Sequence, residues 1–442
     1  MNQSTIRRAL AAVQCALQIV YVGVILVGKP PASFGPGNVI SGDDSRGYIW
    51  AAHHWPWERT AAQVAPLMPA VFAAVGGSAR LLVLAQTAIA IVAWQFLAGA
   101  AARTCRRPVV ATVAFTIVLC LSLVPEVIIW NVAIGSESLA ISTMVAGLAA
   151  VLTAVRRNET KWWLISAVLV ALSVLARDTF AINAIAFALG ASIVAVRRAE
   201  FRRICIACTL ICVAAVAASQ ALAERGDPPR WFYPVQENIV LRVLPDPNLT
   251  SYFVEHGLPQ VDGLRDVGRN YFFQHLRLQN GAEFEPFRTW LRANGESVYL
   301  GALIRHPKWA AAQVFDTRSE WIAPVVTGYT AIPRATPGAV YGLFGVLVFW
   351  RVPALMFALF AAAAVALAWR KPWTDDHALR VVLAATFATA SVHVVAAVLG
   401  DVLEIGRHTL AAGLQLRLAT IVVFCVVVDR LIVRGRVGVV VQ

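Results

Sequence analysis

The sequence predicts an all-α membrane protein, a bundle of about ten transmembrane helices with an extracytoplasmic loop region. Three observations indicate this fold class. Of the 442 residues, 59% are hydrophobic and only 14% are charged, whereas soluble domains carry roughly 25% charged residues. The mean hydropathy is +0.66. Apolar runs long enough to cross about 30 Å of hydrocarbon recur along the chain, with basic residues between them.

The apolar runs define the expected spans. The first follows Arg7 and Arg8, and its length of about 20 residues favours an uncleaved helix over a signal peptide. The ten expected spans are 9–28, 80–102, 108–124, 137–155, 162–177, 179–196, 204–223, 352–369, 379–398 and 410–429. Arg177 and Asp178 alone separate the fifth span from the sixth, which predicts a tight hairpin. The shorter apolar stretch 338–351 is expected to be interfacial or re-entrant.

We expect three parts in the chain. Residues 1–223 form an N-terminal transmembrane half that includes the first outer loop, and residues 352–442 form the C-terminal transmembrane helices. Between them, residues 224–351 mix Pro-rich turns with amphipathic stretches such as 283–315, which predicts a small folded unit outside the membrane.

Basic residues in alternate loops predict the orientation of the chain. Loops on one side hold 18 basic and five acidic residues, whereas the other side holds 20 of each. By the positive-inside rule the first side is cytoplasmic. Both termini are then cytoplasmic, and the long segment 224–351 lies outside. We therefore expect a multi-pass protein of the inner (plasma) membrane.

Two other interpretations of the composition are disfavoured. A net charge of +13 would suit nucleic-acid binding, but the basic residues are scattered in pairs and form no stripe interleaved with aromatic residues. Cys205-x-x-Cys208 has the spacing of a redox or metal pair. It lies within an apolar run without a nearby His, so these cysteines are interpreted as small buried hydrophobic residues.

Paired carboxylates follow the first expected span. Asp43 and Asp44 lie in the sequence Gly-Asp-Asp-Ser-Arg-Gly-Tyr that ends at Tyr48, on the predicted outer side. One carboxylate raises the pKa of the other, which suits a general base, and such a pair also suits a divalent cation. A solvated turn is the alternative interpretation of the pair alone.

Two more ionisable groups lie at the outer ends of the middle spans. Glu137 begins the fourth span, where a carboxylate either complements the helix dipole or takes part in chemistry. Arg177 and Asp178, at the tip of the hairpin, either form a local ion pair or bind an anion. Ionisable groups at membrane helices are costly, which makes them functional candidates.

The fourth group lies between the last two spans. Glu404-x-x-Arg407-His408 precedes the final span, and Arg407 and His408 suit phosphate binding through charge-assisted hydrogen bonds. Arg417 lies about two and a half turns deeper, where a partner inside the bundle is favoured over lipid. The four groups place carboxylates and cations around one outer face. A site that activates a hydroxyl and stabilises a leaving phosphate needs both.

These motifs resemble the GT-C superfamily of polyprenyl-phosphate-sugar-dependent glycosyltransferases, in its bacterial integral membrane form. An Asp-Ser-x-x-Tyr motif in the first outer loop is similar to the residues from Asp44 to Tyr48. A Ser-Glu-x-Leu motif at a helix start is similar to 136–139, and a late Arg-His is similar to Arg407-His408. In the long outer segment, patterns containing Arg242 and Tyr299 also look like those of bacterial members.

The resemblance implies inverting transfer of a sugar from a polyprenyl-phosphate donor to an acceptor hydroxyl on the extracytoplasmic face. It implies that Asp44 is the catalytic base, with Asp43 as the alternative, and that Glu137 orients the acceptor or supports the base. The expected substrate-binding residues are Tyr48, Arg177, Arg407, His408 and Arg417. No cofactor is required, and a Mg²⁺ or Mn²⁺ ion at the paired aspartates stays an open alternative. The expected partners are the lipid-linked donor, a lipid or polysaccharide acceptor and membrane lipids.

A polytopic transporter or lipid flippase is the main alternative. That function predicts inverted repeats and helices broken near the membrane midplane. The sequence shows neither, and the candidate residues gather on one face. A non-catalytic scaffold is a further alternative, but the long outer segment has balanced charge and no large apolar patch to bind a partner.

Overall fold

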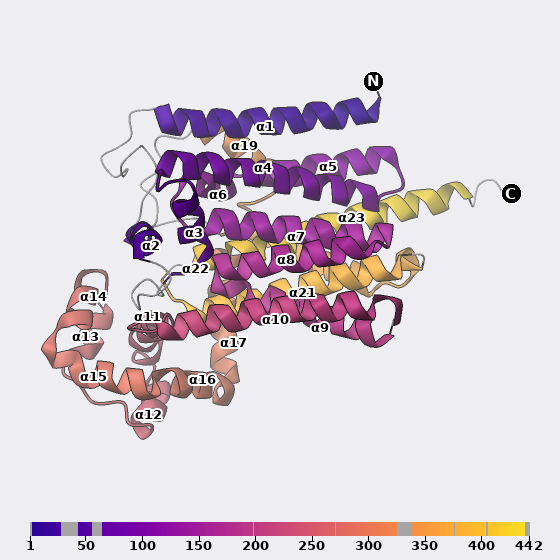
Figure 1. Cartoon of the computed structure of the whole chain (residues 1–442). Helices are drawn as coiled ribbons and strands as arrows, with labels where there is room; N and C mark the ends of the chain where they lie inside the picture. The colour runs from indigo at the N-terminus through magenta and orange to yellow at the C-terminus, as the bar shows by residue number, and fades with distance from the viewer. Residues whose placement is uncertain are drawn as a thin grey trace.

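The computed structural model describes residues 2–27, 43–54, 64–197, 199–269, 271–324, 338–374, 376–403 and 405–437. Within these ranges the chain is helical and contains no β-strand. Long helices run side by side in a bundle, and a group of short helices packs at one end of it (Figure 1). The predicted all-α membrane bundle is confirmed.

Each of the ten expected apolar runs forms a helix. These helices are α1 (Gln3–Val27), α4 (Ala79–Thr104), α5 (Pro108–Ser122), α7 (Glu137–Arg157), α8 (Thr160–Ala176), α9 (Ala181–Arg197), α10 (Arg202–Arg225), α20 (Pro353–Ala368), α21 (His377–Gly400) and α23 (Leu410–Val437). Among the described residues, six helical segments are long and apolar enough to cross a membrane: α1, α4, α7, α9 with its preceding turn, α10 with the short helix before it, and α21. The protein is therefore multi-pass, and the number of ten crossings stays a prediction.

A bend follows the third expected span. After α5 the chain continues as α6 (Pro125–Ile128) and η2 (Ile129–Val132), at an angle of 58° to α5. Pro125 has no backbone N–H and holds Val124 in an extended conformation, with φ −61° and ψ 135°. Because α5 has already risen about 22 Å over its 15 residues, the bend lies near the end of the span. It therefore differs from the midplane break expected of a transporter.

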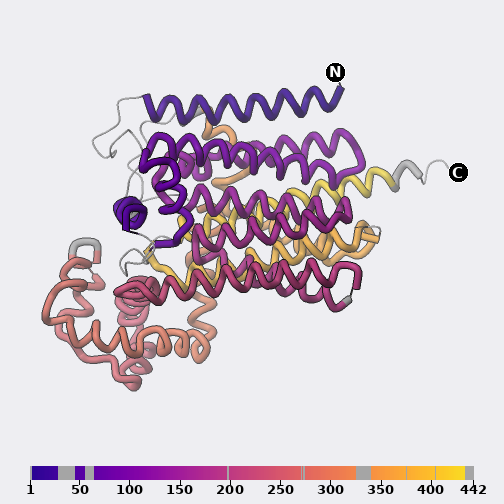
Figure 2. The backbone as a smooth tube through the Cα atoms, viewed as in Figure 1, coloured from indigo at the N-terminus to yellow at the C-terminus, as the bar shows by residue number. Residues whose placement is uncertain are grey.

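The two ends of the bundle differ. α1 begins and α23 ends at the same end, and the short helices lie at the opposite end (Figure 2). The direction of each helix also places the α4–α5, α7–α8, α9–α10 and α20–α21 connections at the end shared by the termini. These connections carry the basic loops, so we name this the basic end and the opposite one the site end. Which end faces the cytoplasm stays a prediction.

A buried ionic cluster joins the helices at the basic end. The Asp429 carboxylate accepts hydrogen bonds from the backbone N–H groups of Arg106 (2.8 Å) and Arg107 (2.7 Å). Arg430 pairs with Asp376 at 2.5 Å, and Arg156 pairs with the same carboxylate at 3.2 Å. Asp429 and Arg430 are almost fully buried. Such pairs are strongly interdependent, because removing one partner leaves a desolvated charge.

A unit of short helices, residues 232–322, lies at the site end. Its elements are α11 (Phe232–Asn238), η5 (Ile239–Val243), α12 (Pro247–Glu255), α13 (Leu264–Arg269), α14 (Tyr271–Asn280), η6 (Ala282–Phe284), α15 (Glu285–Trp290), η7 (Leu291–Gly295), α16 (Glu296–Arg305), α17 (Pro307–Asp316) and α18 (Arg318–Ile322). Phe253, Phe284 and Phe287 are fully buried in a core of its own. We call it the short-helix unit; the predicted domain boundaries around it stay predictions.

The remaining elements are short. They are α2 (Asp43–His54), α3 (Leu67–Ala74), η3 (Asp178–Phe180), η4 (Ala199–Phe201), α19 (Gly338–Leu347), η8 (Lys371–Trp373) and α22 (Ile405–His408). α19 lies within the apolar stretch 338–351, and the Tyr341 hydroxyl donates a hydrogen bond to the Leu17 carbonyl of α1 at 2.6 Å. α2, α3 and α22 lie at the site end (Figure 1).

Candidate functional site

Four of the predicted site residues meet at the site end. Glu137 begins α7, Arg177 lies between α8 and η3, and Arg407 and His408 belong to α22. The tight hairpin places Arg177 at the tip because α8 ends at Ala176 and α9 begins at Ala181. Residues up to 270 positions apart in the sequence thus contact one another.

Glu137 is the centre of this group. One carboxylate oxygen, Oε1, accepts hydrogen bonds from Arg407 Nε at 2.5 Å and from Arg177 Nη1. The other, Oε2, is buried and has no hydrogen-bond partner among the described residues. A Cβ atom added at Gly135 would lie 2.7 Å from Oε2, so the glycine leaves room for this oxygen. The carboxylate binds two guanidinium groups, and whether it also takes part in chemistry stays a prediction.

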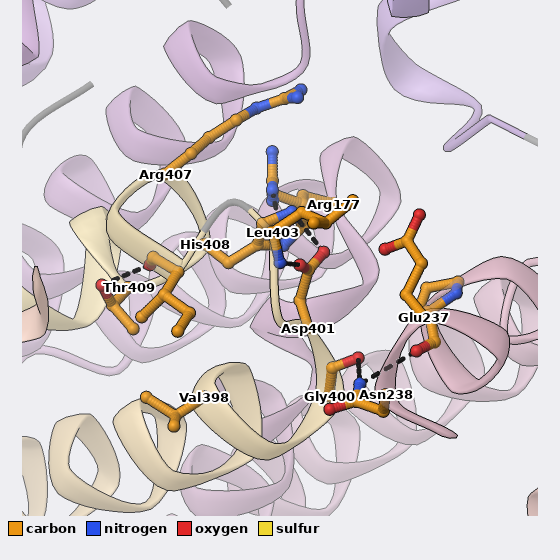
Figure 3. Close-up of polar contacts among 12 residues, drawn as sticks. Arg177, Glu237, Asn238, Val398, Gly400, Asp401, Leu403, Arg407, His408 and Thr409 are labelled. Carbon is orange, nitrogen blue, oxygen red and sulfur yellow. Dashed lines mark hydrogen bonds and ion pairs between the residues drawn. The ribbon is translucent and has the colours of Figure 1, made fainter. Parts of the chain in front are cut away.

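His408 links Arg177 to Asp401. Arg177 Nη2 lies 3.0 Å from His408 Nδ1, and His408 Nε2 lies 3.1 Å from an Asp401 oxygen (Figure 3). A guanidinium can only donate, so Nδ1 must accept and the proton must lie on Nε2. His408 is therefore a neutral imidazole. Burial and the nearby charge of Arg177 lower the pKa of His408, and the Asp401 carboxylate opposes this shift.

Arg407 also contacts an aromatic ring. Its guanidinium carbon lies 5.5 Å from the centre of the Trp130 ring, within the range of a cation–π interaction. Trp130 belongs to η2, so the bend at Pro125 places the ring beside the site. The Arg407 side chain is almost fully buried. Its position is thus fixed by the carboxylate of Glu137 and the face of Trp130.

The neighbours Arg177 and Asp178 bind different partners. Asp178 accepts hydrogen bonds from Ser219 Oγ at 2.5 Å and from Arg230 Nη1 at 2.5 Å. Arg230 also donates to the Val64 carbonyl at 2.9 Å. Asp178 therefore fixes the chain that enters the short-helix unit, while Arg177 is directed at Glu137 and His408.

The structure does not bring Arg417 to this group. Its guanidinium donates to the carbonyls of Ile322 (2.5 Å) and Gly413 (3.0 Å) and lies 4.0 Å from the centre of the Trp350 ring. Arg417 lies in α23, the helix that follows the short α22 of Arg407 and His408. We expected Arg417 to have a partner inside the bundle. Its partners there are backbone carbonyls and the ring of Trp350.

The first outer motif lies in α2. Asp43 and Asp44 are its first two residues, and their side chains lie outside the described part of the structure, as does Glu404. Ser45 Oγ donates a hydrogen bond of 2.7 Å to the Ile134 carbonyl, and Tyr48 is buried in the bundle core. The start of α2 is therefore held against the segment that leads into Glu137.

The short-helix unit caps the end of α21 beside the site. A helix C-terminus leaves its last carbonyls without intrahelical partners. Three buried side chains of the unit supply donors: Arg242 Nη1 to Val398 O (2.6 Å), Tyr299 Oη to Leu399 O (2.7 Å) and Asn238 Nδ2 to Gly400 O (3.1 Å). Asp401 follows immediately, so these bonds fix the carboxylate that His408 contacts. The sequence patterns included Arg242 and Tyr299, but they did not predict that these residues cap α21. They did not include Asn238.

Glu237 and Tyr271 add a second carboxylate at the rim of the site. Glu237 on α11 lies across from Asp401 (Figure 3), and the Tyr271 hydroxyl donates to Glu237 Oε1 at 3.0 Å. Burial raises the pKa of Tyr271, and the carboxylates of Glu237 and Asp401 raise it further. Sequence reasoning missed Asp401, Glu237 and Tyr271 because no short motif marks them. Within the described residues, no three His, Cys, Asp or Glu side chains lie together as a metal site.

The fold and this group define a multi-pass helical membrane protein with a buried ionic site at one end of its bundle. Comparisons of the sequence with protein-family models and with curated proteins found no match. Among solved structures, the chain is similar to archaeal oligosaccharyltransferase AglB from Archaeoglobus fulgidus in complex with an inhibitory peptide and a dolichol-phosphate, with 13% identity and a TM-score of 0.47. It is also similar to the Archaeoglobus fulgidus oligosaccharyltransferase in the apo form, with 14% identity and a TM-score of 0.46.

Both alignments cover 94% of this chain and 50% of the solved one, so the chain spans about half the length of these structures. Identities and TM-scores this low carry no argument about function. The function is therefore argued from the site itself.

Proposed function

We propose that this protein is a membrane glycosyltransferase that moves a sugar from a polyprenyl-phosphate donor to an acceptor hydroxyl, with inversion, on the extracytoplasmic face. One observation carries the proposal: Arg177 and Arg407 converge on the buried carboxylate of Glu137 beside the helix that begins with Asp43 and Asp44. Cations that can bind a phosphate thus lie near the start of the helix that carries the candidate base.

In the proposed reaction, Asp44 takes the proton of the acceptor hydroxyl as its oxygen attacks the anomeric carbon. The bond between that carbon and the phosphate oxygen breaks, and the polyprenyl phosphate leaves with the electron pair. A phosphate is a stable anion and needs no proton to leave. Stabilisation of its developing charge by fixed donors is then the main catalytic contribution.

Glu137 suits the role of fixing those donors. Its Oε1 holds one edge of each guanidinium, so Arg177 and Arg407 need not reorganise when charge develops on the phosphate. Neutral His408 adds no charge but holds Arg177 from the other side. Under this proposal two arginines, rather than three cations, bind the leaving group, and Glu137 is a positioning residue.

The place of the site suits a lipid-linked donor. The residues lie at the ends of α7, α8 and α21, three apolar helices of the bundle. A donor embedded in the bilayer reaches such a site sideways, with its phosphate at headgroup depth. The short-helix unit bonds the end of α21 just before Asp401, and under this proposal an acceptor of lipid or polysaccharide type approaches from the aqueous side.

An in vitro transfer assay tests the proposal. Purified protein in lipid nanodiscs is incubated with a panel of polyprenyl-phosphate sugars that includes mannose and arabinofuranose donors, together with candidate acceptors. We expect a glycosylated product whose anomeric configuration, measured by NMR, is inverted relative to the donor. Folded protein that transfers no sugar from any donor, but moves a labelled lipid across a vesicle bilayer, would replace this function with the flippase alternative.

A further inference from the structure

Two neighbouring helices of the short-helix unit expose apolar side chains. On α16, Leu300 and Ile304 are 51% and 80% exposed, and on α17 Phe315 is 58% exposed. Leu300 and Ile304 are four residues apart and therefore share one helix face. On α17 the exposed residues Ala311, Ala312 and Phe315 also share one face, with exposed Lys308 one turn before them. Each helix thus presents one apolar face outward; together we call these faces the α16–α17 surface.

The opposite faces of both helices are packed. Val298 and Ala302 of α16 lie in the core of the short-helix unit. Val314 of α17 packs in a cluster with Val394 and Val398 of α21. α17 therefore lies against the last turns of a helix that is long and apolar enough to cross a membrane. In Figure 1, α17 lies at the edge of the short-helix unit, beside the bundle.

The α16–α17 surface continues onto the lipid-facing surface of the bundle. Val392 and Val395 near the end of α21, and Phe357 near the start of α20, are exposed apolar residues. α21 ends and α20 begins at the site end, so these side chains lie at the depth where α17 packs. An exposed apolar face at this depth is therefore next to the same lipid that surrounds the apolar helices of the bundle.

Cationic side chains border the surface. Arg305 ends α16, Lys308 lies in the first turn of α17, and Arg318 follows α17, all three exposed. The Arg318 guanidinium carbon lies 4.5 Å from the centre of the Phe315 ring, and its Nη1 donates to the Phe315 carbonyl at 2.9 Å. Exposed Asp316 is the acidic neighbour on α17. Apolar residues flanked by several cations are typical of helices that lie in the headgroup region of a bilayer.

We infer that the α16–α17 surface lies in the membrane interface at the site end. Leu300, Ile304 and Phe315 insert among the upper acyl chains, and Arg305, Lys308 and Arg318 contact anionic phospholipid headgroups. Charge complementarity and continuity with the lipid-facing helices select a lipid surface as the occupant. This inference does not depend on the reaction that the site performs.

Depth-dependent fluorescence quenching tests the inference on the full chain. A cysteine replaces Ile304 or Phe315 and is labelled with an environment-sensitive fluorophore in proteoliposomes. The seven native cysteines are buried or half-buried, so the parent protein gives the labelling background. Leu276→Cys on α14 is the matched control, because Leu276 is 61% exposed on the same unit. In Figure 1, α14 lies on the side of the unit away from α17.

We expect nitroxide-labelled lipid to quench positions 304 and 315 at least about twofold more than position 276, and aqueous iodide to show the reverse order. Equal iodide quenching at all three positions would overturn the inference. So would protection of 304 and 315 from both quenchers, which would indicate that a second protein copy covers the surface.

The headgroup contact has its own test. In the triple variant Arg305→Gln, Lys308→Gln and Arg318→Gln, lipid quenching at position 304 should no longer rise when phosphatidylglycerol is added to phosphatidylcholine vesicles. The matched control exchanges Arg265, Arg269 and Arg277 for Gln on α13 and α14, and should keep the response. An unchanged response in the first variant contradicts the anionic-lipid contact.

Discussion

Glu137→Gln probes the buried ion network most sharply. Glutamine keeps the size of the side chain but removes the negative charge that Arg177 and Arg407 share. Both guanidiniums are buried, with side-chain exposures of 12% and 5%. Removing one partner of a buried ion pair costs about 3–5 kcal/mol, because the remaining charge stays desolvated. We expect the free energy of unfolding to fall by that amount.

Glu126→Gln is the matched control. Glu126 is also buried at the site end, with 4% of its side chain exposed, but its partner Arg351 is 66% exposed. An ion pair whose cation reaches water contributes roughly 0–1 kcal/mol. Glu126→Gln is therefore expected to cost about 1 kcal/mol or less, clearly below the cost of Glu137→Gln.

The assay is detergent-titrated unfolding of the purified protein, followed by tryptophan fluorescence. A double-mutant cycle of Glu137→Gln with Arg407→Gln measures the pair directly, and residues in one network couple by about 0.5–3 kcal/mol. Equal stabilities of Glu137→Gln and the native protein, or a coupling energy of zero, would refute this description of the network.

Three further predictions follow from the site. Arg407→Lys keeps the charge but not the planar guanidinium, so donor use should fall at least about tenfold with little loss of stability; unchanged donor kinetics would remove the phosphate role. The pKa of His408 is lowered in the folded state, so the unfolded chain takes up this proton first. The contribution of His408 to the free energy of unfolding should therefore be complete above a pH of about 6.5 and decrease as the pH falls below it. In thermal unfolding scans, His408→Gln should make stability depend less on pH in this range. A cysteine introduced at position 250 or 404 should react with an impermeant reagent from outside, and one at the exposed position 158 should not; one reversed position contradicts the orientation.

The sequence sufficed to predict the helices because spanning a membrane imposes a minimum apolar length. It also grouped Glu137, Arg177 and His408, since all three lie at helix ends on the same predicted side. The predicted span 108–124 stops just before Pro125, and the short helices α6 and η2 that follow the bend were not predicted. Pro125 has no backbone N–H, which agrees with the end of the predicted span before it.

The pairing of individual charges could not be predicted. Arg177 and Asp178 are adjacent in the sequence, yet the backbone directs Arg177 to Glu137 and Asp178 to Arg230. Arg242 caps α21 by donating a hydrogen bond to the Val398 carbonyl, which lies 156 positions further along the sequence. Such contacts depend on how distant helices pack, and hydropathy and short motifs hold no information about that packing.

The most direct test of the central claim compares Asp44→Asn with Asp43→Asn in the sugar-transfer assay. Asparagine keeps the shape of the side chain and removes the base, and a general base contributes about a hundred- to ten-thousand-fold to the rate. We predict a loss of that size in Asp44→Asn, with membrane insertion and unfolding unchanged. Loss in Asp43→Asn alone would move the base by one residue, and full activity in both variants would contradict the proposed mechanism.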